Sequence, residues 1–313
     1  MILIILLLVA VFSILLFTLY YLYTQIFCYP KKLRPAIRDI PESNFYRTHR
    51  EAMLSEIQKM ETTPFEDVRI LSTDGLTLHG RMYLLKEGAP LVIFFHGFHG
   101  VFAWDGYGFF KLCTEHGINI LMVDERTHGE SEGRAITFGI KERYDCKMWT
   151  EYATKRFGNE TTIFLAGVSM GAASVMMASE LGLPDTVKGI IADCGYSEPS
   201  AIIKETIRQM NFPVNPVYQI LKLGAHLFGH FNLEEASALE AVQTLQIPIL
   251  LIHGTCDSIV PPAMCQWLYD ACTASKDLLL VDGADHANSA LPDYAAYAAA
   301  VITFISNQLA VTS

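Results

Sequence analysis

The chain has 313 residues, of which 51% are hydrophobic and 18% charged, and its formal net charge at pH 7 is −10. This composition supplies enough apolar side chains for the core of one large α/β domain. The acidic balance argues against a nucleic-acid-binding protein, which normally presents a basic face. The seven cysteines are an odd set without C-x-x-C spacing, so they predict neither a disulfide framework nor a zinc site.

The first segment, Ile2 to Tyr23, is almost wholly apolar, with only Ser13 and Thr18 as small polar residues. About 20 such residues cross a bilayer as a helix, and the tyrosines at its end are typical of a membrane interface. The alternative is a cleaved signal peptide. No basic side chain precedes the apolar run and no small-residue cleavage site follows it, which favours an uncleaved anchor over residues 1–25.

Basic residues follow the apolar run, and such charges orient a single-pass helix. They are Lys31, Lys32, Arg34 and Arg38. This asymmetry predicts that the part of the chain after the helix faces the cytoplasm, and unpaired cysteines suit a reducing compartment. Residues 26–63 are expected to form a juxtamembrane spacer with a helix around Arg47–Met60.

A hairpin is predicted next, because Val68–Leu71 and Leu76–Tyr83 flank the turn residues Asp74 and Gly75. Strand and helix patterns then alternate. Strands are expected at Leu91–Phe95, Ile118–Val123, Ile163–Ala166, Val187–Ala192, Ile249–His253 and Leu278–Val281. Helices are expected at Tyr107–His116, Lys141–Phe157, Ala172–Leu181, Gln266–Ala274 and Tyr294–Asn307.

Repeated strand–helix–strand units predict an α/β fold for residues 64–313, a doubly wound and mostly parallel sheet with helices on both faces. The alternation stops between about residues 196 and 246. The helical pattern there is punctuated by Pro199, Pro213 and Pro216. This stretch is expected to be a helical lid inserted over an active site.

The apolar strand Ile163–Ala166 leads directly into Gly167-Val168-Ser169-Met170-Gly171, and a helical pattern follows. A strand, a sharp Gly-x-Ser-x-Gly turn and a helix are the context that a nucleophilic serine needs. The turn exposes the hydroxyl, and side chains in place of the two glycines would collide with neighbouring elements. So short a motif also arises by chance, so Ser169 needs support from the rest of the chain.

A serine hydroxyl needs a histidine base, and that histidine needs a carboxylate to fix its tautomer. In doubly wound hydrolases the order is serine, acid, histidine, each after a strand. Asp257 follows the predicted strand Ile249–His253, and His286 follows Leu278–Val281. We therefore expect Ser169, Asp257 and His286 to form a catalytic triad.

Other residues compete for these roles. Asp193 also ends a strand, and Asp282 and Asp285 lie close to His286 in the sequence. Asp257 is favoured as the acid, and Asp282 is expected to brace the histidine loop. His253 precedes the acid and is expected to pack and to form hydrogen bonds.

The oxyanion of an acyl-transfer intermediate needs preorganised N–H donors. The backbone N–H of Met170, directly after the nucleophile, is one expected donor. The loop His96-Gly97-Phe98-His99-Gly100 follows a predicted strand, and the backbone N–H of Phe98 is the expected second donor. His96 is expected to be a buried structural residue, whereas His99 is left open between substrate contact and solvent.

Five motifs together resemble the α/β-hydrolase superfamily over nearly all of residues 65–310. They are His96-Gly-Phe, Asp124-x-Arg126-x-His128-Gly129-x-Ser131, Gly-Val-Ser169-Met-Gly, His253-Gly-x-x-Asp257 and His286. The stretch Ile136-Thr-Phe-Gly followed by Glu142, Asp145 and Trp149 is similar to membrane-tethered bacterial α/β-hydrolase domain-containing esterases. Thr127 departs from the pattern, since relatives usually carry glycine there in a structural loop.

This resemblance implies an α/β-hydrolase fold and hydrolysis of acyl esters, or less often of thioesters or amides, without a metal or cofactor. We expect a single-pass membrane-anchored serine esterase, with a small-molecule or lipid ester as substrate. The first alternative is an acyltransferase or serine peptidase that uses the same triad. The second is a catalytically inactive, membrane-anchored binding or scaffold protein.

Overall fold

The computed structural model describes residues 1–40, 42, 47 and 49–312. An eight-stranded sheet with the order β1-β2-β4-β3-β5-β6-β7-β8 forms its centre. The strands are β1 (Glu66–Leu71), β2 (Thr77–Tyr83), β3 (Leu91–Phe95), β4 (Asn119–Val123), β5 (Ile163–Val168), β6 (Val187–Asp193), β7 (Ile249–Gly254) and β8 (Lys276–Val281). Strands β1 and β2 form the antiparallel hairpin, and β3 to β8 pair in parallel. The predicted α/β architecture is confirmed.

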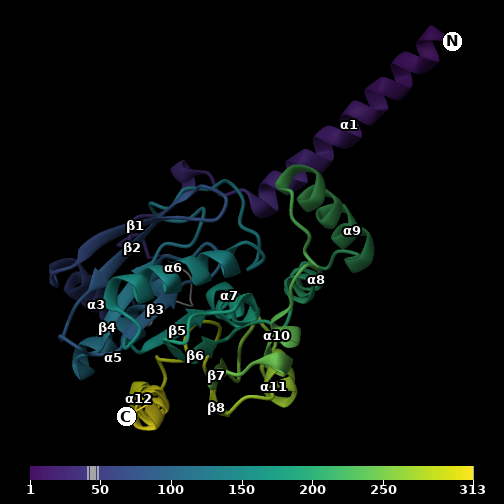
Figure 1. Cartoon of the computed structure of the whole chain (residues 1–313). Helices are drawn as coiled ribbons and strands as arrows, with labels where there is room; N and C mark the ends of the chain where they lie inside the picture. Colours follow the sequence, from purple (N-terminus) through teal and green to yellow (C-terminus); the bar gives the residue numbers. More distant parts are fainter. Residues whose placement is uncertain (41, 43–46, 48, 313) are drawn as a thin grey trace.

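Helices cover both faces of this sheet (Figure 1). They are α3 (Arg50–Thr62), α4 (Phe102–Asp105), α5 (Tyr107–His116), α6 (Glu142–Phe157), α7 (Met170–Ala178), α11 (Pro262–Ala271) and α12 (Tyr294–Thr312), with the short 3₁₀ turns η1 (Lys31–Leu33) and η2 (Ser179–Leu181). Alternate strand residues enter different cores: Ile93 packs with α6 and α7, whereas Val92 packs with α3, α5 and α12. Burial on both faces is why β3 is a continuous apolar run.

Most predicted boundaries agree with the structure to within two residues. Helix α5 has the predicted bounds and ends at Gly117, whose φ of 63° suits glycine better than any other residue. Helix α11 begins four residues earlier than predicted, at Pro262, because proline is well tolerated in the first turn of a helix. Helix α4 was not predicted, since four residues are too few to show a helical period.

Between β6 and β7 the chain forms α8 (Pro199–Gln209), α9 (Val214–Gly224), the π-helical turn η3 (Ala225–Gly229) and α10 (Ala238–Thr244). Helix α10 packs against α7 and α11 and so belongs to the layer that covers the sheet. Helices α8 and α9 instead extend away from the sheet toward the base of the N-terminal helix (Figure 1).

The N-terminal helix α1 (Ile2–Phe27) is long and apolar enough to cross a membrane, and its most apolar window is 0% buried. Its last turns differ from the rest, because Tyr23 and Phe27 are buried in the core of the domain. Backbone hydrogen bonds continue this attachment: the N–H of Ile136 donates to the carbonyl of Phe27 over 2.7 Å, and that of Tyr29 to Arg134 over 3.3 Å.

The segment that links α1 to the sheet is also packed into the domain. The helix predicted around Arg47–Met60 is α3, which begins at Arg50, and residue 48 of that prediction lies outside the described residues. Met53, Ile57 and Met60 of α3 are at most 1% exposed and pack with α4 and α5. Residues 50–62 therefore contribute to the core on the same face of the sheet as Val92, α5 and α12.

Candidate active site

The turn between β5 and α7 places Ser169 in a strained backbone conformation, with φ of 54° and ψ of −113°. The two flanking glycines are sterically required. A Cβ atom on Gly167 would overlap the backbone of Gly171 and Ala172, and one on Gly171 would overlap the carbonyl group of Phe95. The close approach of β5, α7 and β3 is thus what holds the serine hydroxyl clear of the sheet.

Three residues from distant parts of the chain meet at this turn. Nε2 of His286 lies 2.9 Å from Oγ of Ser169, and Nδ1 of His286 lies 2.8 Å from Oδ2 of Asp257. Asp257 follows β7 and His286 follows β8, and all three side chains are buried. Since parallel strands end at the same edge of a sheet, this convergence follows from the topology.

Hydrogen bonds keep the carboxylate of Asp257 charged. Its Oδ1 accepts the N–H groups of Ile259 and Val260 over 2.9 and 2.8 Å, and its Oδ2 also lies 3.2 Å from Nε2 of His253. Burial alone raises the pKa of Asp257, but the bonds from His253 and His286 outweigh it and hold that pKa well below its usual range. A permanent anion here can orient His286 and stabilise its protonated form.

The competing carboxylates are engaged elsewhere. Asp193 accepts the hydroxyl of Ser289 over 2.6 Å. Asp282 accepts the hydroxyl of Thr255 over 3.2 Å, which links the loop after β7 to the loop after β8. Asp285 accepts the backbone N–H of His286 over 2.8 Å and the N–H and hydroxyl of Ser258. Asp285, which the sequence left without a role, therefore braces the histidine loop most directly.

The loop after β3 presents its backbone to the same place. His96 is fully buried: its Nδ1 bonds to the carbonyl of Gly97 over 2.8 Å, and its Nε2 accepts the N–H of Glu125 over 3.1 Å. The N–H of Gly97 donates to Oδ2 of Asp105 over 2.7 Å. In the described part of the chain, the N–H groups of Phe98 and Met170 donate to no protein acceptor.

Comparison with known proteins supports the hydrolase fold. Residues 87–233 match the family model described as "Serine aminopeptidase, S33". The esterase Pf2001 of Pyrococcus furiosus has a similar fold, with a TM-score of 0.65 and 22% identity, over 80% of this chain and 93% of that one. Est1E from Butyrivibrio proteoclasticus, solved with ferulic acid bound, has a TM-score of 0.61 and 22% identity, over 78% of this chain and 99% of its own. The chain has the α/β-hydrolase fold.

Of two proteins similar in sequence, one is uncharacterized and the other is a lipase that matches a smaller part of this chain. YqkD of Bacillus subtilis (strain 168), an uncharacterized protein, is 24% identical over 82% of this chain and 83% of its own length. The lysophosphatidylserine lipase ABHD12 of Danio rerio is 26% identical over 62% of this chain and 50% of its own. The family model and the fold together support hydrolase activity.

Asp105 is a site residue of this hydrolase that the sequence did not reveal. Its Oδ2 accepts the N–H of Gly97. A Cβ atom added to Gly97 would lie 3.2 Å from Oδ2 of Asp105 and 3.2 Å from Cβ of Ser169, so Asp105, Gly97 and Ser169 are packed together. Burial raises the pKa of Asp105. The only available signal was a carboxylate nine residues after His96, on a helix too short to predict. Asp105 fixes the loop so that Phe98, not Gly97, has the free N–H.

Aromatic side chains form one side of the site. Phe98 stacks on His99 with ring centroids 4.0 Å apart and on Phe138 at 5.0 Å. His99 stacks in turn on Tyr29 at 4.1 Å, and Phe138 meets Phe27 of α1 edge to face at 5.8 Å. Burial lowers the pKa of His99, so this wall is uncharged. His99 thus stacks between two aromatic rings and is partly exposed to solvent.

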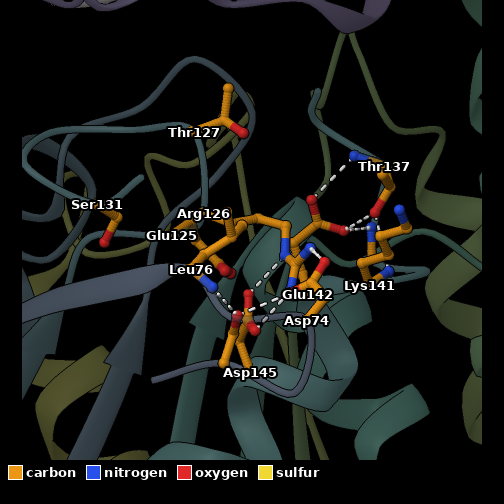
Figure 2. Close-up of polar contacts among 12 residues, drawn as sticks. Asp74, Leu76, Glu125, Arg126, Thr127, Ser131, Thr137, Lys141, Glu142 and Asp145 are labelled. Carbon is orange, nitrogen blue, oxygen red and sulfur yellow. Dashed lines mark hydrogen bonds and ion pairs between the residues drawn. The ribbon is translucent and has the colours of Figure 1, made fainter. Parts of the chain in front are cut away.

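Behind this wall, the Asp124–Ser131 loop acts as a scaffold. Arg126 donates to Asp145 of α6 over 2.6 and 2.7 Å and to Asp74 of the β1–β2 turn over 3.0 Å, and Figure 2 shows the three side chains interlocked. His128 accepts the N–H of His99 through Nε2 over 3.1 Å. The loop therefore supports the residues that line the site and contributes none of the reacting groups.

Among the described residues, Cys194 offers a potential metal ligand beside the triad, within 4.8 Å of ligand atoms of Asp257 and His286. Burial raises the pKa of its thiol well above the usual range, and a metal would need the thiolate. The nearest atoms of Asp257 and His286 are already bonded to each other. The hydrogen bond between His286 and Asp257 suits these two groups to proton transfer.

Proposed function

We propose that this chain is a membrane-anchored serine hydrolase that cleaves carboxylic esters through Ser169, His286 and Asp257. The observation that carries the proposal is the pair of distances along this relay, 2.9 Å from serine to histidine and 2.8 Å from histidine to aspartate. A hydroxyl next to a neutral imidazole, itself held by a buried carboxylate, is the arrangement that activates a serine.

In the first half-reaction Oγ of Ser169 attacks the ester carbonyl carbon while Nε2 of His286 takes the hydroxyl proton. The carbonyl oxygen becomes an oxyanion, and the N–H groups of Phe98 and Met170 are the donors proposed to stabilise it. The C–O bond then breaks, and His286 returns its proton to the leaving alcohol. Asp257 stays ionised throughout and stabilises the transient imidazolium.

In the second half-reaction His286 takes a proton from water, and the resulting hydroxide attacks the acyl group on Ser169. A second oxyanion forms in the same pocket and collapses, with His286 protonating Oγ of the serine. The carboxylic acid leaves and the enzyme returns to its starting state. All proton transfers use Nε2, because Nδ1 remains bonded to Asp257.

The aromatic wall supports an ester with an apolar acyl or aryl group. Phe98 is 37% exposed, so it offers apolar contact next to the proposed oxyanion donors. A peptidase of the kind that the family model names is the second candidate. An aminopeptidase must hold a substrate ammonium group, but Asp193 is bonded to Ser289 and the pKa of Asp105 is raised, which makes both weak partners for a cation.

Membrane anchoring by α1 is part of the proposal, and packing of its last turns supports it. A signal peptide would be cleaved near the end of the apolar run. Such cleavage would separate or remove Tyr23 and Phe27, which are 6% and 0% exposed in the core of the domain. We propose residues 1–25 as anchor and 64–313 as hydrolase domain with a lid at about 196–246, facing the cytoplasm as the basic residues after α1 suggest.

Labelling of the full-length protein with a fluorophosphonate probe tests the catalytic proposal. Wild type should label and should hydrolyse aryl esters of increasing acyl length, whereas Ser169→Ala should do neither while unfolding at the same temperature. Equal labelling of both would support an inactive scaffold. A new ester formed in the presence of an added alcohol would support acyl transfer, and release of amino-terminal residues from peptides would support the peptidase.

A further inference from the structure

The helical insertion carries an apolar surface that nothing in the described chain covers. Its five large side chains are 42–59% exposed: Met210, Phe212, Ile220, Leu223 and Leu227. Ile220, Leu223 and Leu227 are spaced by three and four residues, so they form one stripe along α9 and η3. Single apolar residues on a surface are ordinary, but a continuous stripe marks an interaction site. We call Ile220, Leu223 and Leu227 the lid stripe.

The stripe has a defined place around the axis of α9. At about 100° per residue, the buried residues Tyr218, Leu221 and Ala225 lie on the opposite side, where they pack into the core. A polar face lies on one flank of the stripe, with Asn215, Gln219, Lys222 and His226. Gly224 and Phe228 lie on the other flank. A helix with separate apolar and polar surfaces of this kind is typical of one that lies in a membrane interface.

The flank with Gly224 and Phe228 is the one that contacts α1. The ring of Phe228 meets the rings of Tyr20 and Tyr23 with centroids 5.1 and 5.7 Å apart. A Cβ atom on Gly224 would lie 3.2 Å from Cβ of Tyr23, so α9 and α1 are in close contact at this point. The lid stripe is therefore continuous with the surface of the proposed anchor.

The level of this contact along α1 matches the edge of a bilayer. Over residues 2–18 every side chain is exposed, and burial begins at Leu19. Those residues rise about 26 Å along a helix, close to the roughly 30 Å of a bilayer's hydrocarbon core. Leu19–Tyr23 then lie where the hydrocarbon ends. In Figure 1, α9 runs from the base of α1 across the direction of the α1 axis. If α1 crosses a bilayer, α9 would therefore lie along the bilayer surface.

We propose that the lid stripe lies in the interface of the same bilayer that α1 crosses, so the insertion is a second membrane contact and lipid-dissolved esters reach the site from the bilayer. The inference rests on the proposed membrane-anchored esterase function and names its substrate source. The polar face with Lys222 and His226 would point toward headgroups and water. Lys31 and Lys32, directly after α1, would lie at the same level.

Tryptophan quenching tests the position of the stripe without using activity. The full-length protein is reconstituted into phosphatidylcholine vesicles with or without lipids brominated in the upper acyl chain. Trp267 is 51% exposed and is replaced by Phe, whereas Trp104 and Trp149 are buried and give a constant background. Leu223→Trp is the probe, and Leu280→Trp on β8 is the matched control, since the native leucines are 49% and 48% exposed.

Emission from Leu223→Trp should shift to the blue in vesicles and be quenched by the brominated lipid. The control should show neither effect. Equal quenching at both positions, or none at position 223, would overturn the proposal. This arm does not depend on turnover, so it still gives an answer if the chain hydrolyses no ester.

A second arm measures the consequence for the substrate. The triple variant Ile220→Gln, Leu223→Gln and Leu227→Gln should lower turnover of a long-chain ester dissolved in vesicles by about tenfold or more. Turnover of a water-soluble short-chain ester should stay at the wild-type value, which also shows that the variant is folded. The control triple variant Leu71→Gln, Leu84→Gln and Leu280→Gln should lower neither. Equal loss on both substrates by the first variant would contradict delivery from the bilayer.

Discussion

Two clusters of charged and polar side chains lie next to this sheet, and they use carboxylates differently. The first is Ser169, His286 and Asp257 at the ends of β5, β7 and β8. The second is Arg126 with Asp145 and Asp74, shown in Figure 2, between the loop after β4, α6 and the first hairpin. Each joins elements distant in the sequence.

The clusters differ in how completely their hydrogen bonds are satisfied. Arg126 uses Nε, Nη1 and Nη2 on two carboxylates, and Glu142 beside it accepts the N–H and hydroxyl of Thr137 and the N–H of Gly139. In the cluster around Ser169, the hydrogen-bonding groups are satisfied by protein partners only on the Asp257 side. We call a cluster closed where its groups are satisfied in this way. Toward the aromatic wall, the N–H groups of Phe98 and Met170 have no acceptor within the described chain. A closed cluster stabilises the fold, whereas an open one can bind a reacting group.

The largest expected effect comes from Asp257→Asn. The amide would keep the shape of the site but could hold His286 in the wrong tautomer, so ester turnover should fall by about 10⁴-fold. The N–H bonds from Ile259 and Val260 to the remaining oxygen should preserve the fold. Steady-state kinetics and thermal unfolding of the same preparation measure both.

A loss of turnover that is fully explained by a fraction of unfolded protein would contradict the catalytic role of Asp257. Asp193→Asn is the matched comparison, because Asp193 is equally buried, is bonded to Ser289 and ends the neighbouring strand. It should change turnover far less than Asp257→Asn.

The closed cluster should behave in the opposite way. Arg126→Met leaves the buried carboxylate of Asp145 without its partner, and the free energy of unfolding should fall by about 3–5 kcal/mol. Turnover per folded molecule should stay near wild type, because Arg126 contacts no reacting group. Denaturant unfolding, with turnover normalised to the folded fraction, tests the prediction.

An exposed pair supplies the control for Arg126. Arg69 and Glu130 are 50% and 54% exposed, so Arg69→Met should cost less than about 1 kcal/mol. Equal destabilisation by Arg126→Met and Arg69→Met would show that burial of the Arg126 cluster contributes little.

The catalytic cluster was more accessible to sequence analysis than the closed one. Ser169, Asp257 and His286 each follow a strand of six residues, β5, β7 or β8. Topology alone then predicts that they meet at one edge. The partners of Arg126 have no such rule, since Asp74 lies in a hairpin turn and Asp145 on a helix, and only the packing of these elements brings them together.

Two other features could not be predicted from the sequence, for physical reasons. Asp105 lies on a helix of four residues, too short for any periodic pattern. The contact of Tyr23 with Gly224 joins α1 to an insertion some 200 residues later, and a long apolar helix gives no sign of which turns pack against protein. Both are tertiary contacts, which local propensity does not encode.

Glu125 allows a sharper comparison, because it is a carboxylate in the closed region without any partner. Both of its oxygens are buried and make no hydrogen bond. Burial, and then the charges of Glu142 and Asp145, raise its pKa well above the usual range. The folded state therefore binds the carboxyl proton of Glu125 more tightly than the unfolded state does. The contribution of protonated Glu125 to the free energy of unfolding is fully present below about pH 4.3 and is lost as pH rises through the folded-state pKa.

Glu125→Gln should therefore raise the free energy of unfolding at pH 7 by more than about 1.4 kcal/mol, the equivalent of one unit of pKa. The gain should shrink toward zero at pH 4, where the glutamate is protonated in both states. Denaturant unfolding at a series of pH values measures the difference. A difference that does not change with pH would mean that Glu125 is not held protonated.

The smallest expected effect is at Thr127, the one position where the scaffold loop departs from the superfamily pattern. Its φ of 72° is the left-handed conformation that favours glycine, which costs threonine about 1–2 kcal/mol. Its hydroxyl donates to the carbonyl of Ala135 over 3.0 Å, and such a bond returns about 1 kcal/mol. Thr127→Gly should thus change stability by less than about 1 kcal/mol, because strain and hydrogen bond are lost together.

Thr127→Ala separates the two contributions, since it keeps the backbone strain and loses the hydrogen bond. It should be less stable than Thr127→Gly by about 1 kcal/mol or more, measured by denaturant unfolding at one pH. Turnover of both variants should equal that of wild type, because the loop supports His99 through His128 and not through Thr127. An alanine variant as stable as the glycine variant would show that the loop relaxes out of the left-handed conformation, and the position would then tolerate any small residue.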